Sequence, residues 1–308
     1  MAGPEEDPTQ PSVPPPGAEP VGVSGSAGPY APDPVTPLDT DDTRGLHFGR
    51  MIRKPWLLSL GITLAIIAFT AGTTQGNAGI GAGGAVLVFL LVAAIVFAIA
   101  SSRAKEDFFA AYARGRGLNR QQKGTLPATT PLLRKGDRRY GEQIMNGTLP
   151  GGLPGIVALY TYEEETTDSD GDRDTEYYRF TVVMHDLPSV AARVSDVYCQ
   201  RRSGFRFMDS AEDVFRRMQR LELESEAFDK RFEVFYGAND AELLLKQLFS
   251  PSFIVWLAEQ APDQLAFELS AGSLCVNVKG HHDSAPEFDE ICEAAALVAR
   301  RLAEEASE

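Results

Sequence analysis

Three arginines form the clearest candidate for an anion-binding site in this 308-residue chain. Arg201, Arg202 and Arg206 lie close together, with Gly204 between them, in a C-terminal region that is otherwise acidic. Guanidinium groups bind phosphate and carboxylate groups through paired hydrogen bonds. The spacing predicts a site for an anion or a lipid headgroup, and a solvated strand–turn surface is the alternative.

Two polar motifs contain residue types that bind metal ions, but neither has the spacing of a metal site. If Gly171 took the sixth position of an EF-hand loop, the first and twelfth positions would be Thr166 and Tyr177, which supply no carboxylate. The run His281–Asp283 has no further histidine or cysteine at ligand spacing. The sequence therefore predicts no metal site and no cofactor.

Groups for acid–base or nucleophilic catalysis do not form a known motif. Glutamates gather at 163–165 and 222–226, yet close carboxylates arise by chance among the 31 acidic residues of 155–308. The sequence contains no Gly-x-Ser-x-Gly, Walker or His-Glu-x-x-His motif. Cys199, Cys275 and Cys292 form no Cys-x-x-Cys pair, which indicates reduced thiols. These observations favour a protein that is not an enzyme.

Charge divides the chain into stretches of different character. Residues 1–44 hold 1 basic and 8 acidic residues, 45–102 hold 3 and 0, 103–154 hold 10 and 4, and 155–308 hold 15 and 31. The net charge of −14 disfavours a protein that binds nucleic acid through a basic surface.

The first 44 residues are acidic, rich in Pro and Gly, and nearly free of large apolar side chains. Such a segment buries too little surface to offset its ordering entropy, so we predict a disordered tail over 1–44. A ligand for a proline-binding domain, through Pro14–Pro16, is the alternative for part of it.

Two uncharged apolar runs, 56–74 and 85–102, predict a transmembrane helical hairpin within 45–102. A glycine-rich connection at 75–84 separates them. Basic residues flank the outer ends of both runs and none lies between them, which predicts a plasma (inner) membrane protein with both termini cytoplasmic. Small residues leave a homo-oligomer open through close helix packing; these are Gly61, Gly72, Gly79 and Gly83.

The basic juxtamembrane segment 103–139 begins with an amphipathic pattern. Phe108, Phe109 and Tyr112 share one helical side. The pattern predicts an interfacial helix, and the basic residues around it are candidates for contact with anionic lipid headgroups. The alternative is the flank of the preceding span. The candidate headgroup residues are Arg103, Lys105, Arg114, Arg116, Arg120 and Lys123.

Residues 140–308 read as a cytosolic α+β domain. Alternation and β-branched residues predict strands at 156–162, 176–184, 194–198, 205–208 and 232–235, and a hairpin of 265–269 with 273–278. Helical periodicity predicts helices at 210–221, 241–249, 251–259 and 285–306. The last helix should bury Phe288, Ile291, Cys292, Ala295, Val298 and Leu302.

The strongest pattern in the domain lies between 222 and 257. It comprises Glu224, Ser225, Phe228, Arg231, Phe232, Val234, Asp240, Phe249, Ser250, Pro251, Phe253 and Leu257. These residues resemble a bacterial family of unknown function with paired N-terminal membrane spans and a cytosolic domain. Phe249 and Ser250 depart from that family's usual Leu and Thr. The resemblance implies an architecture and no activity.

Together these patterns predict an α+β cytosolic domain attached to a two-helix transmembrane hairpin, with a disordered N-terminal tail. The predicted function is a membrane-tethered, non-enzymatic protein that binds a partner protein or senses the membrane surface, with membrane lipids as further partners. A membrane-associated enzyme acting on lipid or envelope substrates is the first alternative. An oligomeric pore built from the hairpin is the second.

Overall fold

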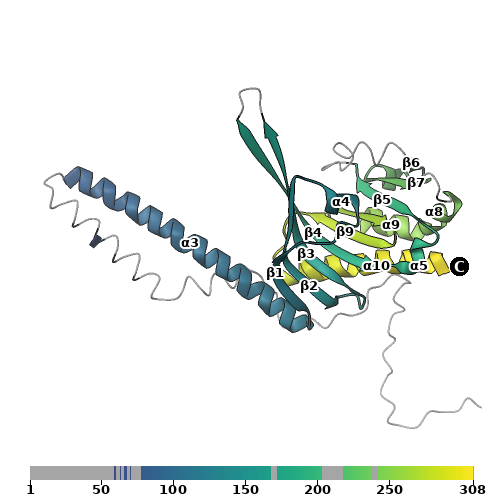
Figure 1. Ribbon diagram of the computed structural model, residues 1–308, viewed down its shortest axis with the longest axis horizontal. Helices are drawn as coiled ribbons and strands as arrows, with labels where there is room; N and C mark the ends of the chain where they lie inside the picture. The colour runs from purple at the N-terminus through teal and green to yellow at the C-terminus, as the bar shows by residue number, and fades with distance from the viewer. Residues whose placement is uncertain are drawn as a thin grey trace, which may run out of the picture. The chain divides into compact units, whose positions relative to one another are not determined.

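The computed structural model describes a long helix followed by a sheet-based domain (Figure 1). The described residues are 78–167, 172–202, 218–237, 240 and 242–307, with Ser59, Thr63, Ile66, Ile67 and Thr70. The predicted tail, most of the first predicted span and the predicted strand at 205–208 lie outside these residues.

Nine strands of the described chain form one sheet, in the order β1-β2-β3-β4-β9-β8-β5-β7-β6. Every neighbouring pair is antiparallel. The strands are β1 (Asn119–Gly124), β2 (Arg138–Thr148), β3 (Pro154–Thr167), β4 (Arg173–Asp186), β5 (Asp196–Arg201), β6 (Met218–Leu221), β7 (Phe232–Gly237), β8 (Leu265–Ser270) and β9 (Ser273–Lys279).

The helices are α3 (Ala78–Arg116), α4 (Pro131–Arg134), α5 (Pro188–Ala191), α7 (Glu226–Asp229), α8 (Glu242–Leu248), α9 (Pro251–Glu259) and α10 (Ala285–Ser307). The predicted helices at 241–249, 251–259 and 285–306 are confirmed, and all six residues predicted to face inward on the last helix are buried. The predicted hairpin is also confirmed, with Ala271 and Gly272 at φ 48° and 81°, as a tight two-residue turn requires.

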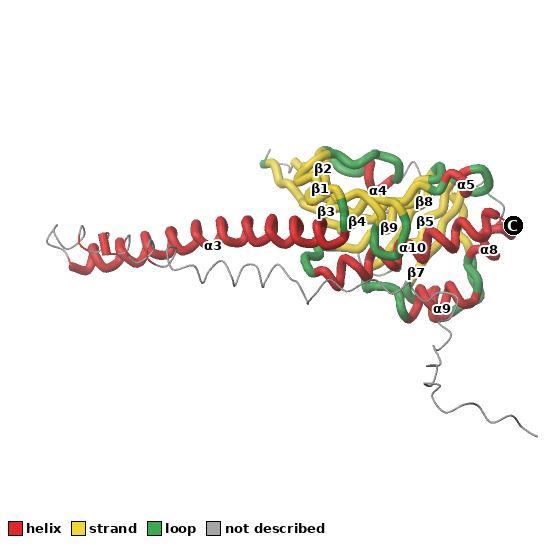
Figure 2. Tube along the Cα trace, turned by 90° about the horizontal axis from the view of Figure 1, so that it is seen from below, coloured by secondary structure: helices red, strands yellow, loops and turns green. Residues whose placement is uncertain are grey.

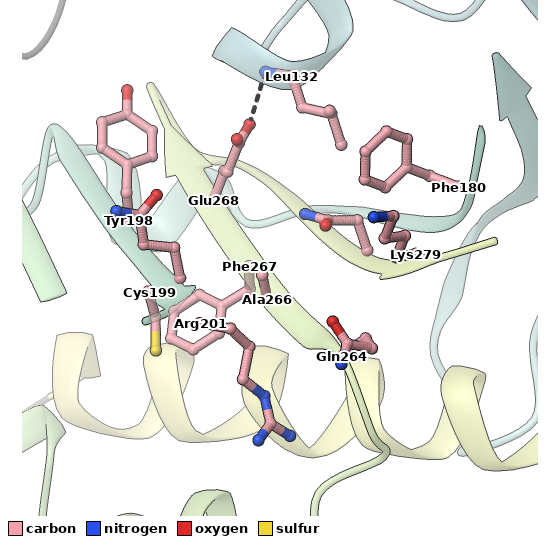
Figure 3. Close-up of a pocket in the computed structure, with 12 residues that line it drawn as sticks. Leu132, Phe180, Tyr198, Cys199, Arg201, Gln264, Ala266, Phe267, Glu268 and Lys279 are labelled. Atoms are coloured by element: carbon pink, nitrogen blue, oxygen red, sulfur yellow. Dashed lines mark hydrogen bonds between the residues drawn. The ribbon is translucent and has the colours of Figure 1, made fainter. Parts of the chain in front are cut away.

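Different helices pack on the two faces of the sheet. Helix α10 packs against β4 and β9 on one face. The short α4 covers the other face, where Leu132 and Leu133 join a cluster with Tyr160, Val182 and Cys275. Figure 3 shows Leu132 and the long C-terminal helix on opposite sides of the central strands.

The predicted transmembrane hairpin, and with it the predicted fold class, is wrong. Among the residues that the structure describes, no helix is both long enough and apolar enough to cross a membrane. The connection predicted at 75–84 is already helical from Ala78, and the second predicted span is the front part of α3, a single helix of 39 residues (Figures 1 and 2). The structure is instead a domain built on a nine-stranded antiparallel sheet within the described chain.

The predicted localisation is corrected by the same finding. An inner-membrane protein with two spans requires two membrane-crossing helices, and the described part of the chain contains none. The predicted membrane orientation and the alternative of an oligomeric pore both depended on that hairpin, so the same finding removes their basis.

The C-terminal half of α3 packs on the domain, which explains its aromatic stripe. Phe108, Phe109 and Tyr112 are buried. The rings of Phe109 and Tyr112 lie 5.4 and 5.3 Å from the ring of Phe288 in α10. The stripe that the sequence assigned to a membrane interface therefore contacts the closing helix of the domain.

Two further differences concern strands. The predicted helix at 210–221 is wrong at its end, because Met218–Leu221 is β6 and pairs with β7; residues 210–217 lie outside the described chain. Strands β1 and β2, within the segment 119–148, were not predicted, and they extend the sheet beyond β3.

Candidate functional site

A groove of about 760 Å³ lies at the end of the sheet where β6, α7, α8 and α9 meet. Its lining comes from β6, the segment that leads into α7, and helices α7, α8 and α9. Figure 1 shows where β6, α8 and α9 lie. The lining residues are Arg220, Glu222, Leu223, Glu224, Ser225, Asp229, Lys246, Phe249, Pro251, Ile254 and Val255.

The floor of the groove is apolar because one side of α9 is buried in the domain while the other side, which also has apolar residues, faces the groove. Pro251 begins the helix, where its fixed φ suits the first turn. Phe253 is fully buried, and its ring lies 5.7 Å from that of Phe249. The opposite side of the helix presents Ile254, half-buried, and Val255, which is 48% exposed.

The wall opposite α9 is held by α7. The Ser225 hydroxyl accepts a hydrogen bond from the Phe228 N–H at 3.4 Å and so caps this helix. Phe228 then stacks on Phe232 of β7, with ring centroids 5.1 Å apart. These contacts fix the backbone of 223–229, which carries the acidic rim.

A second pocket lies on the α4 face of the sheet and is small, about 40 Å³ (Figure 3). Strands β4, β5, β8 and β9 form its base, and Leu132 of α4 lies above it. Its polar lining includes Glu268, Asn277 and Lys279. This volume suits one or two water molecules rather than a drug-sized ligand.

Glu268 is the carboxylic acid of this second pocket, and its pKa is strongly shifted. Burial raises the pKa of its carboxyl group to about 7, although the Leu132 N–H and the charges of Arg134 and Lys135 act in the opposite direction. One carboxylate oxygen accepts the Leu132 N–H at 3.0 Å. Because Leu132 lies in the first turn of α4, this bond fastens that helix to the sheet.

The predicted lipid-headgroup residues fall into two groups. Three form ion pairs within the domain: Lys105 with Glu142, Arg116 with Asp289, and Arg120 with Glu106. The ammonium of Lys123 lies 4.5 Å from the ring centroid of Tyr140. Arg103, Arg114 and Lys123 are the exposed members of the six. Headgroup contact stays a prediction.

The predicted arginine cluster is not gathered into one site by the described residues. The Arg201 guanidinium lies 4.4 Å from the Phe232 ring centroid and donates to the Pro262 carbonyl at 3.1 Å. Figure 3 shows it pointing away from Glu268, toward the C-terminal helix. Arg202 pairs with Glu233 at 3.2 Å. Arg206 lies outside the described residues.

The polar motifs considered for metal binding serve local contacts. His281 Nε2 lies 3.2 Å from both the Thr161 hydroxyl and the Tyr160 carbonyl. The His282 imidazole lies 3.5 Å from Glu287. Among the described residues, no group of three or more His, Cys, Asp or Glu side chains could hold a metal ion. Part of the acidic loop 168–174 lies outside these residues.

Sequence reasoning did not identify the groove, although its residues carried a signal. Glu222 and Glu224 were considered only as carboxylates for catalysis, and Ile254 and Val255 were read as part of a helix. The pattern at 222–257 does cover most of the lining. Its aromatic members, Phe228 and Phe249 among them, hold the groove walls together, with ring centroids 6.1 Å apart.

Comparisons with known proteins show no family for this chain. No protein-family model matches the sequence, and no curated protein matches it. The crystal structure of the mycobacterial trehalose monomycolate transport factor A, TtfA, is similar with a TM-score of 0.44 and 11% identity, over 65% of this chain and 95% of that chain. A likeness this low carries no argument about function. The resemblance to a bacterial two-span family stays untested.

Proposed function

We propose that this chain is a non-enzymatic interaction module that binds a segment of a partner protein in the groove between β6, α7, α8 and α9. The observation that carries the proposal is the apolar floor of this groove of about 760 Å³, formed by Leu223, Phe249, Pro251, Ile254 and Val255. Concave apolar surface with a polar rim is typical of binding sites.

The lining supports binding rather than catalysis. Among its eleven described residues there is no histidine, no cysteine and no lysine–serine pair joined by a hydrogen bond. The hydroxyl of Ser225 caps α7. The side chains of Glu222 and Glu224 are exposed, so solvent surrounds both carboxylates. The second pocket contains a perturbed acid, Glu268, but its volume leaves no room for a substrate beside it.

A charge placed on the groove floor tests the proposal. In Val255→Asp, an exposed side chain becomes a carboxylate that a bound apolar segment would bury without a partner. For a tenfold loss of affinity, in-cell crosslinking of the full chain followed by purification should recover up to about tenfold less of the partner than with wild type.

The matched control is Ser252→Asp, which adds the same charge at an exposed position of the same helix outside the groove lining. It should recover the partner as wild type does. Equal recovery from both variants, or equal loss from both, would contradict a binding role for the groove.

A further inference from the structure

We infer that the partner segment that occupies the groove is cationic: a short polypeptide segment with apolar side chains for the floor and lysine or arginine side chains for the rim. The inference rests on the proposed function and specifies the chemistry of its ligand. It is carried by the charges around the groove.

Three carboxylates surround the apolar floor, from Glu222, Glu224 and Asp229. Within the described chain none of the three forms an ion pair with a basic residue. Glu222 and Glu224 are exposed and Asp229 is half-buried. Glu224 helps to raise the pKa of Lys246, so its charge is partly compensated, whereas no basic residue of the described chain pairs with Glu222 or Asp229.

The two basic residues of the lining compensate the negative charge of the carboxylates only in part. Lys246 forms an ion pair with Glu242 of the same helix, at 2.8 Å. Its charge is therefore shared with an acid outside the lining. Arg220 is the other basic residue of the lining. Counting Glu242 with the described lining residues gives four acidic and two basic side chains, a net charge of −2 for this set.

The charge of the larger region has the same sign. Residues 155–308 hold 15 basic and 31 acidic residues, a difference of −16. Opposite charge raises the rate at which a partner meets its site, and like charge suppresses wrong partners. An anionic lipid headgroup would meet repulsion here, whereas a basic polypeptide segment would be attracted. The apolar floor and the acidic rim together favour the polypeptide.

Three designed peptides test the inference on the purified full chain. They share one pattern of leucines and carry Lys, Gln or Glu at every polar position. By calorimetry at low salt, we expect the Lys peptide to bind at least about tenfold more tightly than the Gln peptide, and the Glu peptide most weakly. The Lys advantage should shrink at about 1 M salt, where the screening length is about 3 Å.

The double variant Glu222→Gln/Glu224→Gln separates the contribution of the acidic rim to binding from that of the apolar floor. It should weaken binding of the Lys peptide several-fold and leave binding of the Gln peptide unchanged. The control Glu290→Gln/Glu304→Gln removes the same charge from exposed positions of α10 and should leave both affinities unchanged.

The outcomes distinguish the two proposals. Equal affinity for all three peptides, lost in Val255→Asp, would overturn the cationic preference and leave the groove a binding site. Absence of binding by every peptide, or binding that Val255→Asp does not change, would overturn both. Binding of vesicles containing anionic phospholipid, lost in Val255→Asp, would replace the polypeptide with a lipid.

Discussion

At the scale of single residues, Glu268 is a deeply buried carboxylic acid whose neighbours are also titratable, as in many active sites. Its carboxylate receives the Leu132 N–H, and the side chains of Tyr198 and Cys275 lie around it in the same face of the sheet. Burial raises the pKa of both neighbours as well. A structural role explains Glu268 better than a catalytic one, because its carboxylate accepts a hydrogen bond from the first turn of α4.

The pKa of Glu268 makes the stability of the fold depend on pH. The folded state holds the proton more tightly than the unfolded chain, whose carboxyl has a pKa near 4.5. The contribution to the free energy of unfolding is therefore fully present below about pH 4.5 and is lost as the pH rises through about 7. In Glu268→Gln we expect this loss to disappear.

Urea unfolding of wild type and Glu268→Gln at pH 4.5 and pH 8 measures the effect. The difference in unfolding free energy between variant and wild type should shift in the variant's favour by about 3 kcal/mol between the two pH values. The amide carbonyl can still accept the Leu132 N–H. An unchanged difference at both pH values would show that Glu268 does not titrate in this range.

At the scale of elements, the packing of α3 on α10 shows where sequence reasoning succeeds and where it fails. Periodicity correctly predicts that Phe108, Phe109 and Tyr112 share a side of a helix. It cannot say what that side contacts, because a membrane interface and a protein core select the same apolar stripe. The deciding contact, Tyr112 to Asp289, joins residues 177 positions apart.

Strand β1 illustrates a different failure. Its sequence, Asn119–Gly124, has no apolar residue and mostly exposed side chains, so no alternation marks it. It forms because β2 offers an unpaired edge, which is a property of the assembled sheet. By contrast, β3, β4, β8 and β9 are buried at their centres, β3 and β4 are rich in β-branched and aromatic residues, and the sequence predicted all four.

The Asp289 contact gives a prediction for the docking of α3. Asp289 accepts the Tyr112 hydroxyl at 2.9 Å and pairs with Arg116, whose side chain is 9% exposed. In Asp289→Ala the guanidinium and the hydroxyl both lose the Asp289 carboxylate in a buried site. We expect the free energy of unfolding to fall by about 3 kcal/mol, measured by urea denaturation.

Glu304→Ala provides the comparison on the same helix. It removes a pair with Arg301 at 3.9 Å whose acid is 64% exposed, and it should cost less than about 1 kcal/mol. Equal effects of the two substitutions would show that the buried pair does not hold α3 in place.

At the scale of the whole molecule, the groove depends on segments that the sequence identified separately. The pattern at 222–257 covers most of the groove lining, although it was interpreted only as a family resemblance, and the helices at 241–249 and 251–259 were predicted closely. Whether Val255 faces solvent or the core depends on how α9 packs against α7, which local periodicity does not determine. The sequence therefore contained the residues of the groove without indicating a binding site, and the groove became apparent only from the packing of β6, α7, α8 and α9.

The most direct test of the groove is photocrosslinking of the full chain in cells from a photoreactive amino acid placed at Val255. The same amino acid at Tyr177, which is 51% exposed on β4 outside the groove, is the control. We predict that the Val255 position captures a defined partner protein, through a segment containing basic and apolar residues, and that the Tyr177 position does not. Identical products from both positions, or no protein captured from Val255, would contradict the account.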